Sequence, residues 1–326
     1  MKRNIPILLT LAALCALVLY SDAAAEGARR ALAVCAATLV PSLLPFFALS
    51  NLLSSLGLAA LLSGALGPAA RRIFRVSGSG AQAFFLGVTG GYPVGAAVTA
   101  RLRRDGRVTQ EEAGRLLAFC NNSGPAFILG AAGGVFRSAE AGLLLYGTHI
   151  AAALCVGLIL RGKPAATVDG ADRTNGIDGT DGTDRADSAN SAYGSAPAAL
   201  TFAEAFPAAV SQALASVLGV CAWVVLFGAV LGVLGPFLPE EPVWRALAAG
   251  VIELGSGVAS LAGVSPGPES LAAAAFLLGW GGLSVHCQTL GAVAGTDIKC
   301  ARHLLGRALC GVLAAGFSYG LAMIVF

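Results

Sequence analysis

The sequence predicts an all-α polytopic membrane protein with about 8–10 membrane segments, arranged as two pseudo-repeated halves with broken or re-entrant helices. Composition, the spacing of apolar runs and a repeated glycine pattern predict this fold. Of 326 residues, 56% are apolar and only 12% are charged, and the mean hydropathy is +0.76. Soluble globular proteins carry about 25% charged residues. The chain therefore lacks the side chains for a fully water-facing surface.

Apolar runs long enough to cross a bilayer, about 20 residues each, follow one another along the chain. They lie at 5–20, 31–66 (long enough for two segments), 81–100, 116–136, 141–160, 205–235, 246–264, 271–295 and 303–326. The first run also fits a signal peptide, because Lys2 and Arg3 precede it and Ala23-Ala24-Ala25 follows it. We interpret it as a retained helix, with cleavage of residues 1–25 as the alternative.

A polar stretch divides the chain into two membrane halves. Residues 162–200 alternate Asp, Gly, Thr, Ser and Ala and contain almost no large apolar side chain. This composition is typical of a disordered, solvated linker. The predicted organisation is an N-terminal transmembrane half over 1–161, the linker over 162–200 and a C-terminal transmembrane half over 201–326.

Basic residues gather in three places that should all face the cytoplasm by the positive-inside rule. The clusters are Arg71, Arg72 and Arg75; Arg101, Arg103, Arg104, Arg107 and Arg115; and Lys299, Arg302 and Arg307. Uninterrupted spans between them do not place all three on one side. The conflict favours segments that enter and leave the membrane on the same side.

A glycine pattern recurs in corresponding positions of the two halves. Phe85-Leu86-x3-Gly90-Gly91-x2-Val94 matches Phe276-Leu277-x3-Gly281-Gly282-x2-Val285 at a constant offset of 191 residues. Irregular backbone at membrane depth is tolerated where it is buried or lines a cavity. A pair of interrupted segments in an inverted repeat indicates a transporter binding site, with chance similarity of Gly-rich strings as the alternative.

Two candidate binding segments lie in the first half. Gly90, Gly91, Tyr92 and Pro93 predict a helix break near 90–95, followed by a half-helix whose N–H groups suit an anion. The alternative is a kinked packing helix. The polar run Asn121, Asn122, Ser123 and Gly124 predicts a second break near 121–125 with groups free for a ligand or ion, or capping alone.

Two more candidates lie in the second half. Ser284, His286 and Gln288 alternate, so an unwound stretch near 281–288 would present them together, and His286 could relay a proton. The alternative for His286 is an interhelical hydrogen bond. Glu253 is an ionisable group within an apolar run, which favours function over a glutamate that reaches water at a segment boundary.

The sequence has no HExxH or P-loop motif, and its GxSxG string at residues 263–267 overlaps Ser265-Pro266-Gly267-Pro268-Glu269, which is typical of a turn and a capped helix start. We therefore predict a protein that is not an enzyme, with no catalytic residue, no metal site and no cofactor. A coupling ion, proton or sodium, stays open. The net charge of +3 and the dispersed arginines do not indicate nucleic acid.

Several motifs together resemble a known family. Gly91-Tyr92-Pro93-Val94-Gly95-Ala96 and Arg115–Pro125 (RLLAFCNNSGP) are the most specific, supported by Pro41–Phe47 (PSLLPFF) and Leu278–His286 (LGWGGLSVH). They resemble sporulation integral membrane proteins of the nucleoside-recognition Gate group, which is similar to spore maturation proteins A and B and distantly to concentrative nucleoside transporters. The resemblance covers nearly the whole chain outside 162–200.

The resemblance implies a role in endospore formation. It implies transport of a small organic anion, dipicolinic acid, from the mother cell toward the forespore by alternating access across the outer forespore membrane. A nucleoside or nucleobase transporter and a non-transporting spore-envelope assembly factor are the alternatives. The implied partners are the anion and the lipid bilayer, and a second copy of the chain or other sporulation membrane proteins stay open.

Overall fold

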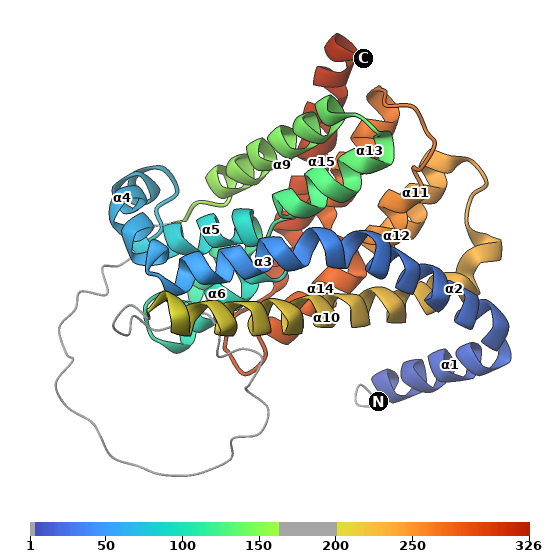
Figure 1. Ribbon diagram of the computed structural model, residues 1–326, viewed down its shortest axis with the longest axis horizontal. Coiled ribbons are helices and arrows are strands. Elements are labelled where there is room, and N and C mark those ends of the chain that lie inside the picture. Colours follow the sequence, from blue (N-terminus) through green and yellow to red (C-terminus); the bar gives the residue numbers. More distant parts are fainter. Residues whose placement is uncertain (1–3, 163–200) are drawn as a thin grey trace.

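A computed structural model describes residues 4–162 and 201–326 (Figure 1). Every regular element in these two ranges is a helix, which confirms the all-α prediction. The predicted linker falls, apart from Gly162, outside the described residues.

The first half contains eleven helical elements within its described part. They are α1 (Ile5–Leu19), α2 (Ser21–Val34), the π-helix η1 (Cys35–Leu39), α3 (Val40–Ser55), α4 (Leu58–Ile73), α5 (Gly78–Gly90), α6 (Val94–Arg104), α7 (Gln110–Phe119), the π-helix η2 (Ala126–Ala132), α8 (Gly133–Phe136) and α9 (Ala139–Ile159). The second half contains α10 (Phe202–Leu234), the 3-10 helix η3 (Gly235–Phe237), α11 (Pro242–Ile252), α12 (Leu254–Ala259), α13 (Pro268–Trp280), α14 (Gly282–Ala292) and α15 (Ala301–Val325).

Five helical stretches among the described residues are long and apolar enough to cross a membrane. They are Ser21–Ser55, Ala139–Ile159, Phe202–Phe237, Pro268–Ala292 and Ala301–Val325. Large apolar side chains are exposed along α1, α10 and α15, as expected for helices that face lipid. The run 31–66 falls on two segments, as its length indicates: a helical stretch that begins earlier, at Ser21, and the separate helix α4. The run 246–264 is wrong in detail, because it is broken at Glu253.

The helices repeat in order between the two halves. Helices α5 and α13 begin at Gly78 and Pro268 and end at Gly90 and Trp280, so both offsets are 190 residues. Helices α6 and α14 follow them and have 11 residues each. In both halves a long helical stretch, Ser21–Ser55 or Phe202–Phe237, precedes these helices, and the two stretches pack side by side (Figure 1).

Small residues allow the long helices to approach closely. A Cβ built on Gly27 of α2 would lie 2.3 Å from the carbonyl oxygen of Gly228 on α10. Likewise, a Cβ on Gly279 of α13 would lie 2.5 Å from the Cα of Gly311 on α15. Backbones this close are typical of helix packing in lipid. No hydrophobic driving force acts between helices there, and small residues allow the close van der Waals contact that holds them together.

Candidate functional site

Four helix breaks meet inside the bundle. They are the α5–α6 break at Gly91, the α7–η2 break at Gly124, the α13–α14 break at Gly281 and the α11–α12 break at Glu253. A Cβ on Gly91, whose φ is +75°, would lie 2.8 Å from the backbone nitrogen of Gly124. The first two breaks are therefore in backbone contact.

Further contacts join the remaining breaks to these two. The Tyr92 hydroxyl, in the first break, donates to the carbonyl oxygen of Leu278 at 3.1 Å, close to the α13–α14 break. A Cβ on Gly282 would lie 3.0 Å from the backbone nitrogen of Leu254, at the α11–α12 break. Unwound backbone from both halves is thus collected in one buried place, as irregular backbone at membrane depth requires.

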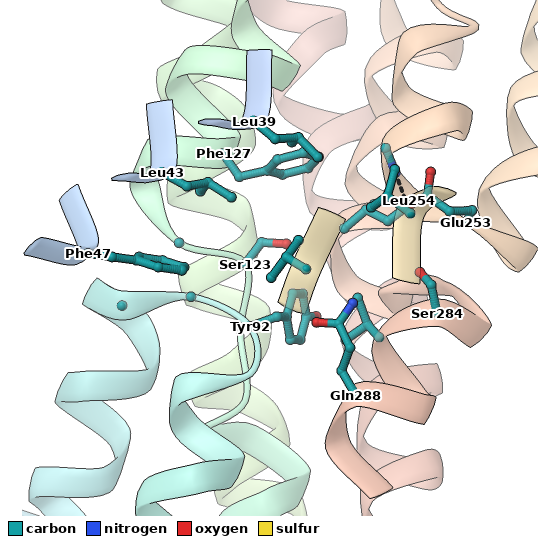
Figure 2. A pocket seen from close by; sticks show the side chains of 17 residues that line it. Leu39, Leu43, Phe47, Tyr92, Ser123, Phe127, Glu253, Leu254, Ser284 and Gln288 are labelled. Carbon is teal, nitrogen blue, oxygen red and sulfur yellow. Dashed lines mark hydrogen bonds between the residues drawn. The ribbon is translucent and has the colours of Figure 1, made fainter. Parts of the chain in front are cut away.

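A small, partly open cavity lies where the breaks meet. Apolar side chains, among them Leu39, Leu43 and Phe127, form one part of its wall, and Tyr92 and Gln288 lie across from them (Figure 2). The predicted site residues in its lining are Gly90, Gly91, Tyr92, Ser123, Gly124, Glu253, Ser284 and Gln288.

The other four predicted site residues do not line this cavity. Pro93 lines a neighbouring cavity, and the rest lie behind the wall. Asn122 donates from Nδ2 to the Phe119 carbonyl oxygen at 2.7 Å, and its Oδ1 accepts from an arginine described below. Asn121 donates from Nδ2 to Thr289 Oγ1 at 2.8 Å, across to the second half. Both amide nitrogens are used within the protein and hold the break in place, whereas Asn121 Oδ1 has no hydrogen-bond partner among the described residues.

His149 of α9 also holds the second break. Its Nε2 accepts a hydrogen bond from the backbone nitrogen of Ser123 at 3.2 Å, and both residues are buried. The Ser123 hydroxyl lines the cavity and lies 3.5 Å from the Leu278 carbonyl oxygen. An orphan amide at the break is therefore satisfied by a side chain from a third helix.

The prediction that residues 284–288 unwind is wrong. Helix α14 begins at Gly282 and is continuous through them. Ser284 and Gln288 are one turn apart and share a helix face, and both line the cavity. Ser284 Oγ and Gln288 Oε1 are buried and have no hydrogen-bond partner within the described chain. Since buried polar atoms are normally satisfied, these two are available to a ligand.

Glu253 forms the break that sequence reasoning did not anticipate. It is 2% exposed, and its extended backbone separates α11 from α12. Its carboxylate accepts from the backbone nitrogens of Gly255 at 2.9 Å and Ser256. It thus caps α12 while one side of the residue contributes to the cavity wall.

Arg307 is a candidate site residue that the sequence patterns do not single out. The positive-inside rule groups it with a cytoplasmic basic loop, but it lies within α15 and is 0% exposed. Its Nη1 donates to Asn122 Oδ1 at 3.2 Å, its Nη2 donates to the Gly279 carbonyl oxygen, and its Cζ lies 5.5 Å from the ring centroid of Tyr92. One signal was present, since an arginine inside an apolar run must be buried in protein or reach water.

The charge of Arg307 has no internal counter-ion. Over residues 4–162 and 201–326, no carboxylate lies within ion-pair distance of its guanidinium, and its Nε has no hydrogen-bond partner. Taking a lone charge out of water is costly unless it is compensated. Tyr92 separates this charge from the cavity by a single ring. A buried positive charge therefore lies next to the Tyr92 part of the cavity wall, and the carboxyl group of Glu253 belongs to the lining of the same cavity.

Outside the membrane segments, the loops of the two halves are linked by an ion pair. Arg103, at the end of α6, donates from Nε and Nη2 to the two carboxylate oxygens of Asp297, each at 2.8 Å. This guanidinium lowers the pKa of Asp297. The bidentate geometry holds the loop after α6 against the loop after α14.

These features define a class: a polytopic integral membrane protein with a buried polar site at discontinuous helices, the architecture of membrane transport proteins. Residues 36–161 match the Gate family model, described as nucleoside recognition. The chain is 31% identical over 318 residues to the sporulation integral membrane protein YlbJ of Bacillus subtilis (strain 168), covering 91% of this chain and 77% of the relative. No solved structure matches. The chain belongs to the YlbJ family of sporulation integral membrane proteins.

Proposed function

We propose that this protein carries a small organic anion, dipicolinic acid, across the outer forespore membrane from the mother cell toward the forespore. The observation that carries the proposal is the buried and unpaired charge of Arg307 beside the central cavity. In a medium of low dielectric constant such a charge acts over several ångströms. An anion in the cavity would supply the missing counter-charge.

The cavity offers the contacts that a planar dicarboxylate needs. Ser123 and Ser284 bring hydroxyl groups to it, and Gln288 brings a side-chain amide. The apolar wall with Leu39, Leu43 and Phe127 suits the flat faces of an aromatic ring. Carboxylates would face the Arg307 side and the ring would lie against the apolar side. Movement of the two repeats around this site would open it alternately to the two sides of the membrane.

A nucleoside or nucleobase is the second candidate substrate. The match to the nucleoside-recognition Gate model favours it, and so do the neutral hydrogen-bonding groups of Ser284 and Gln288. For such a ligand the buried arginine would be structural, and Glu253 would accept hydrogen bonds from ligand hydroxyls. A spore-envelope assembly factor, the third function weighed above, would need no ligand in the cavity at all.

Ligand-dependent thermal protection separates these functions. Purified full-length protein in detergent would be heated with dipicolinate or with uridine, alongside the Arg307→Gln variant. We expect dipicolinate to protect the wild type, and Arg307→Gln to weaken the affinity about tenfold or more, because a charged hydrogen-bonding partner is lost. Uridine should give no protection.

The matched control is Arg302→Gln, which removes an arginine from the same helix whose side chain is 47% exposed. It should bind dipicolinate like the wild type. Arg307→Lys, which keeps the charge but loses the planar fork, serves if the glutamine variant does not fold, and should retain a weakened preference for dipicolinate. Protection by uridine alone would favour the nucleoside function, and protection by neither would favour assembly.

A further inference from the structure

Two histidines form a buried pair behind the cavity wall. His286 of α14 and His303 of α15 are 4% and 1% exposed. Their Nδ1 and Nε2 atoms, respectively, lie 3.0 Å apart, and the rings meet edge to face. The second nitrogen of His303, Nδ1, lies 3.1 Å from the carbonyl oxygen of Leu117 on α7. Three helices from both halves therefore meet at this pair.

The hydrogen bonds fix where the protons are. A carbonyl oxygen only accepts, so His303 must carry its proton on Nδ1 and leave Nε2 as an acceptor. His286 must then donate from Nδ1, because one of the two facing nitrogens has to be the donor. In the neutral pair, Nε2 of His286 is therefore an unprotonated acceptor.

That acceptor is unsatisfied. His286 Nε2 is buried and has no hydrogen-bond partner in the described part of the chain. A buried unpaired nitrogen costs free energy, and this one needs a donor that the described side chains and backbone do not supply. A proton that binds to Nε2 turns this nitrogen into a donor and breaks none of the pair's existing hydrogen bonds.

The pair is electrically coupled to the proposed anion site. His303 lies one turn before Arg307 on the same face of α15, and Arg307 is the charged side chain that acts on both imidazole rings. A second positive charge here would be opposed by burial and by the charge of Arg307. An anion in the cavity would offset that repulsion, so proton binding and anion binding should strengthen each other.

We propose that the His286–His303 pair is a proton-binding site through which transport of the anion is coupled to a proton. This inference rests on the proposed function. A proton from water on the side where the anion enters binds to His286 Nε2 and forms an imidazolium ion, with no other bond broken. The proton leaves the same nitrogen when the anion is released. Arg307 and the imidazolium together then provide two positive charges for the two carboxylates of dipicolinate.

Trp280 provides a direct readout of this protonation. Its indole ring lies 4.4 Å from the His286 ring, edge to face, and an imidazolium ion in contact with indole quenches its fluorescence. Substituting the other two tryptophans, Trp223→Phe and Trp244→Phe, leaves Trp280 as the sole emitter in the full-length protein. Its fluorescence would be followed in lipid nanodiscs from about pH 8 to about pH 3, a range that extends to the acid side of ordinary histidine titration because burial and Arg307 both oppose the imidazolium ion.

We expect acid quenching in this single-tryptophan protein and none when His286→Gln is added. Glutamine donates a hydrogen bond to His303 but does not titrate. Saturating dipicolinate should raise the quenching midpoint by about one pH unit, which corresponds to a tenfold coupling. If His286→Gln does not fold, His303→Asn replaces it; this variant keeps a donor for Leu117, removes the acceptor that stabilises the imidazolium, and should lower the midpoint.

Two results would overturn the inference. Quenching that persists in His286→Gln would place the titrating group elsewhere, and a midpoint that dipicolinate does not move would remove the coupling. Dipicolinate protection and uptake would survive either result, so the proposed function would stand. Loss of dipicolinate binding in the wild type would instead overturn the proposed function itself.

Discussion

In the first half of the molecule, α7 stops at Phe119 and the chain leaves the helix before η2 begins at Ala126, whereas its counterpart in the second half, α15, runs unbroken from Ala301 to Val325. The reverse holds for the segments that precede α5 and α13. Helix α4 is continuous, while α11 and α12 are separated at Glu253. The breaks at Gly91 and Gly281 are the ones that both halves share.

This difference shows how a repeated fold produces an asymmetric site. The break between α7 and η2 in the first half supplies the side-chain amide of Asn122. The unbroken helix α15 of the second half supplies the guanidinium of Arg307, which donates a hydrogen bond to this amide. Each half thus contributes what the other lacks. Two identical halves would place either two such breaks or two such arginines at the centre. Neither arrangement would bring a single buried arginine to a single break.

The largest expected effect comes from pushing the two breaks of the first half apart. A Cβ on Gly95 would lie 2.1 Å from the carbonyl oxygen of Cys120, and helix backbones cannot yield that much without rearrangement. Gly95→Ala should lower the melting temperature by about 5–10 °C or prevent folding. Gly147→Ala, in a helix with nothing within 4 Å of the new methyl group, should be neutral or stabilising. Similar melting temperatures for the two variants would contradict the close packing of the breaks.

Removing the carboxylate of Glu253, which lies at the α11–α12 break, helps to distinguish dipicolinate from a nucleoside as the substrate. Glu253→Gln keeps one oxygen that accepts from the amides of α12 but removes a negative charge from the cavity wall. We expect the affinity for dipicolinate to rise severalfold, because a like charge is lost in a region of low dielectric constant. Isothermal titration of purified protein measures this. A loss of affinity for dipicolinate would contradict the anion account.

A smaller effect is expected where α14 follows the shared break. Ser284 lines the cavity with an unpartnered hydroxyl, so Ser284→Ala should weaken dipicolinate binding about threefold to tenfold. Ser318→Ala is the matched control, since that hydroxyl is also buried and unpartnered but lies in α15 away from the lining residues. Equal binding by both variants would remove Ser284 from the site.

The smallest effect concerns the ion pair that links the two halves outside the membrane. Arg103 lowers the pKa of Asp297, so the pair stabilises the folded protein above the ordinary aspartate pKa of about 3.9 and stops doing so as the pH falls through the lower folded value. Arg103→Gln should lower the melting temperature by a few degrees at neutral pH. The difference from the wild type should shrink as the pH falls below the ordinary aspartate pKa and vanish once Asp297 is protonated in the folded protein, and a difference that grew in acid would contradict this sign.

The sequence predicted the breaks that small and polar residues mark. Gly90-Gly91 with Pro93, the run Asn121–Gly124 and Gly281-Gly282 all coincide with interruptions of helix. The break at Glu253 was missed because the apolar run around it looks continuous, and a carboxylate that caps the next helix is evident only once its partners Gly255 and Ser256 are placed.

Burial of charge was the harder feature to predict. Arg307 follows Lys299 and Arg302 closely in the sequence, so the positive-inside rule groups all three in one loop. In the structure Arg307 lies more than one helical turn beyond Arg302 in α15, at a buried position. The pairing of His286 with His303 depends on how α14 packs against α15. Such contacts between segments follow from tertiary packing, which local patterns do not specify.

The most direct test of the central claim gives Arg307 the counter-ion that it lacks. Asn122→Asp places a carboxylate where Oδ1 already accepts from the guanidinium at 3.2 Å, so the cation would be neutralised within the protein. Uptake of dipicolinate into proteoliposomes would be compared for wild type, Asn122→Asp and the exposed control Arg302→Gln. We predict saturable uptake by the wild type and the control, and a loss of tenfold or more in a folded Asn122→Asp protein. Undiminished uptake by Asn122→Asp would show that the buried charge does not attract the substrate, and would contradict the account.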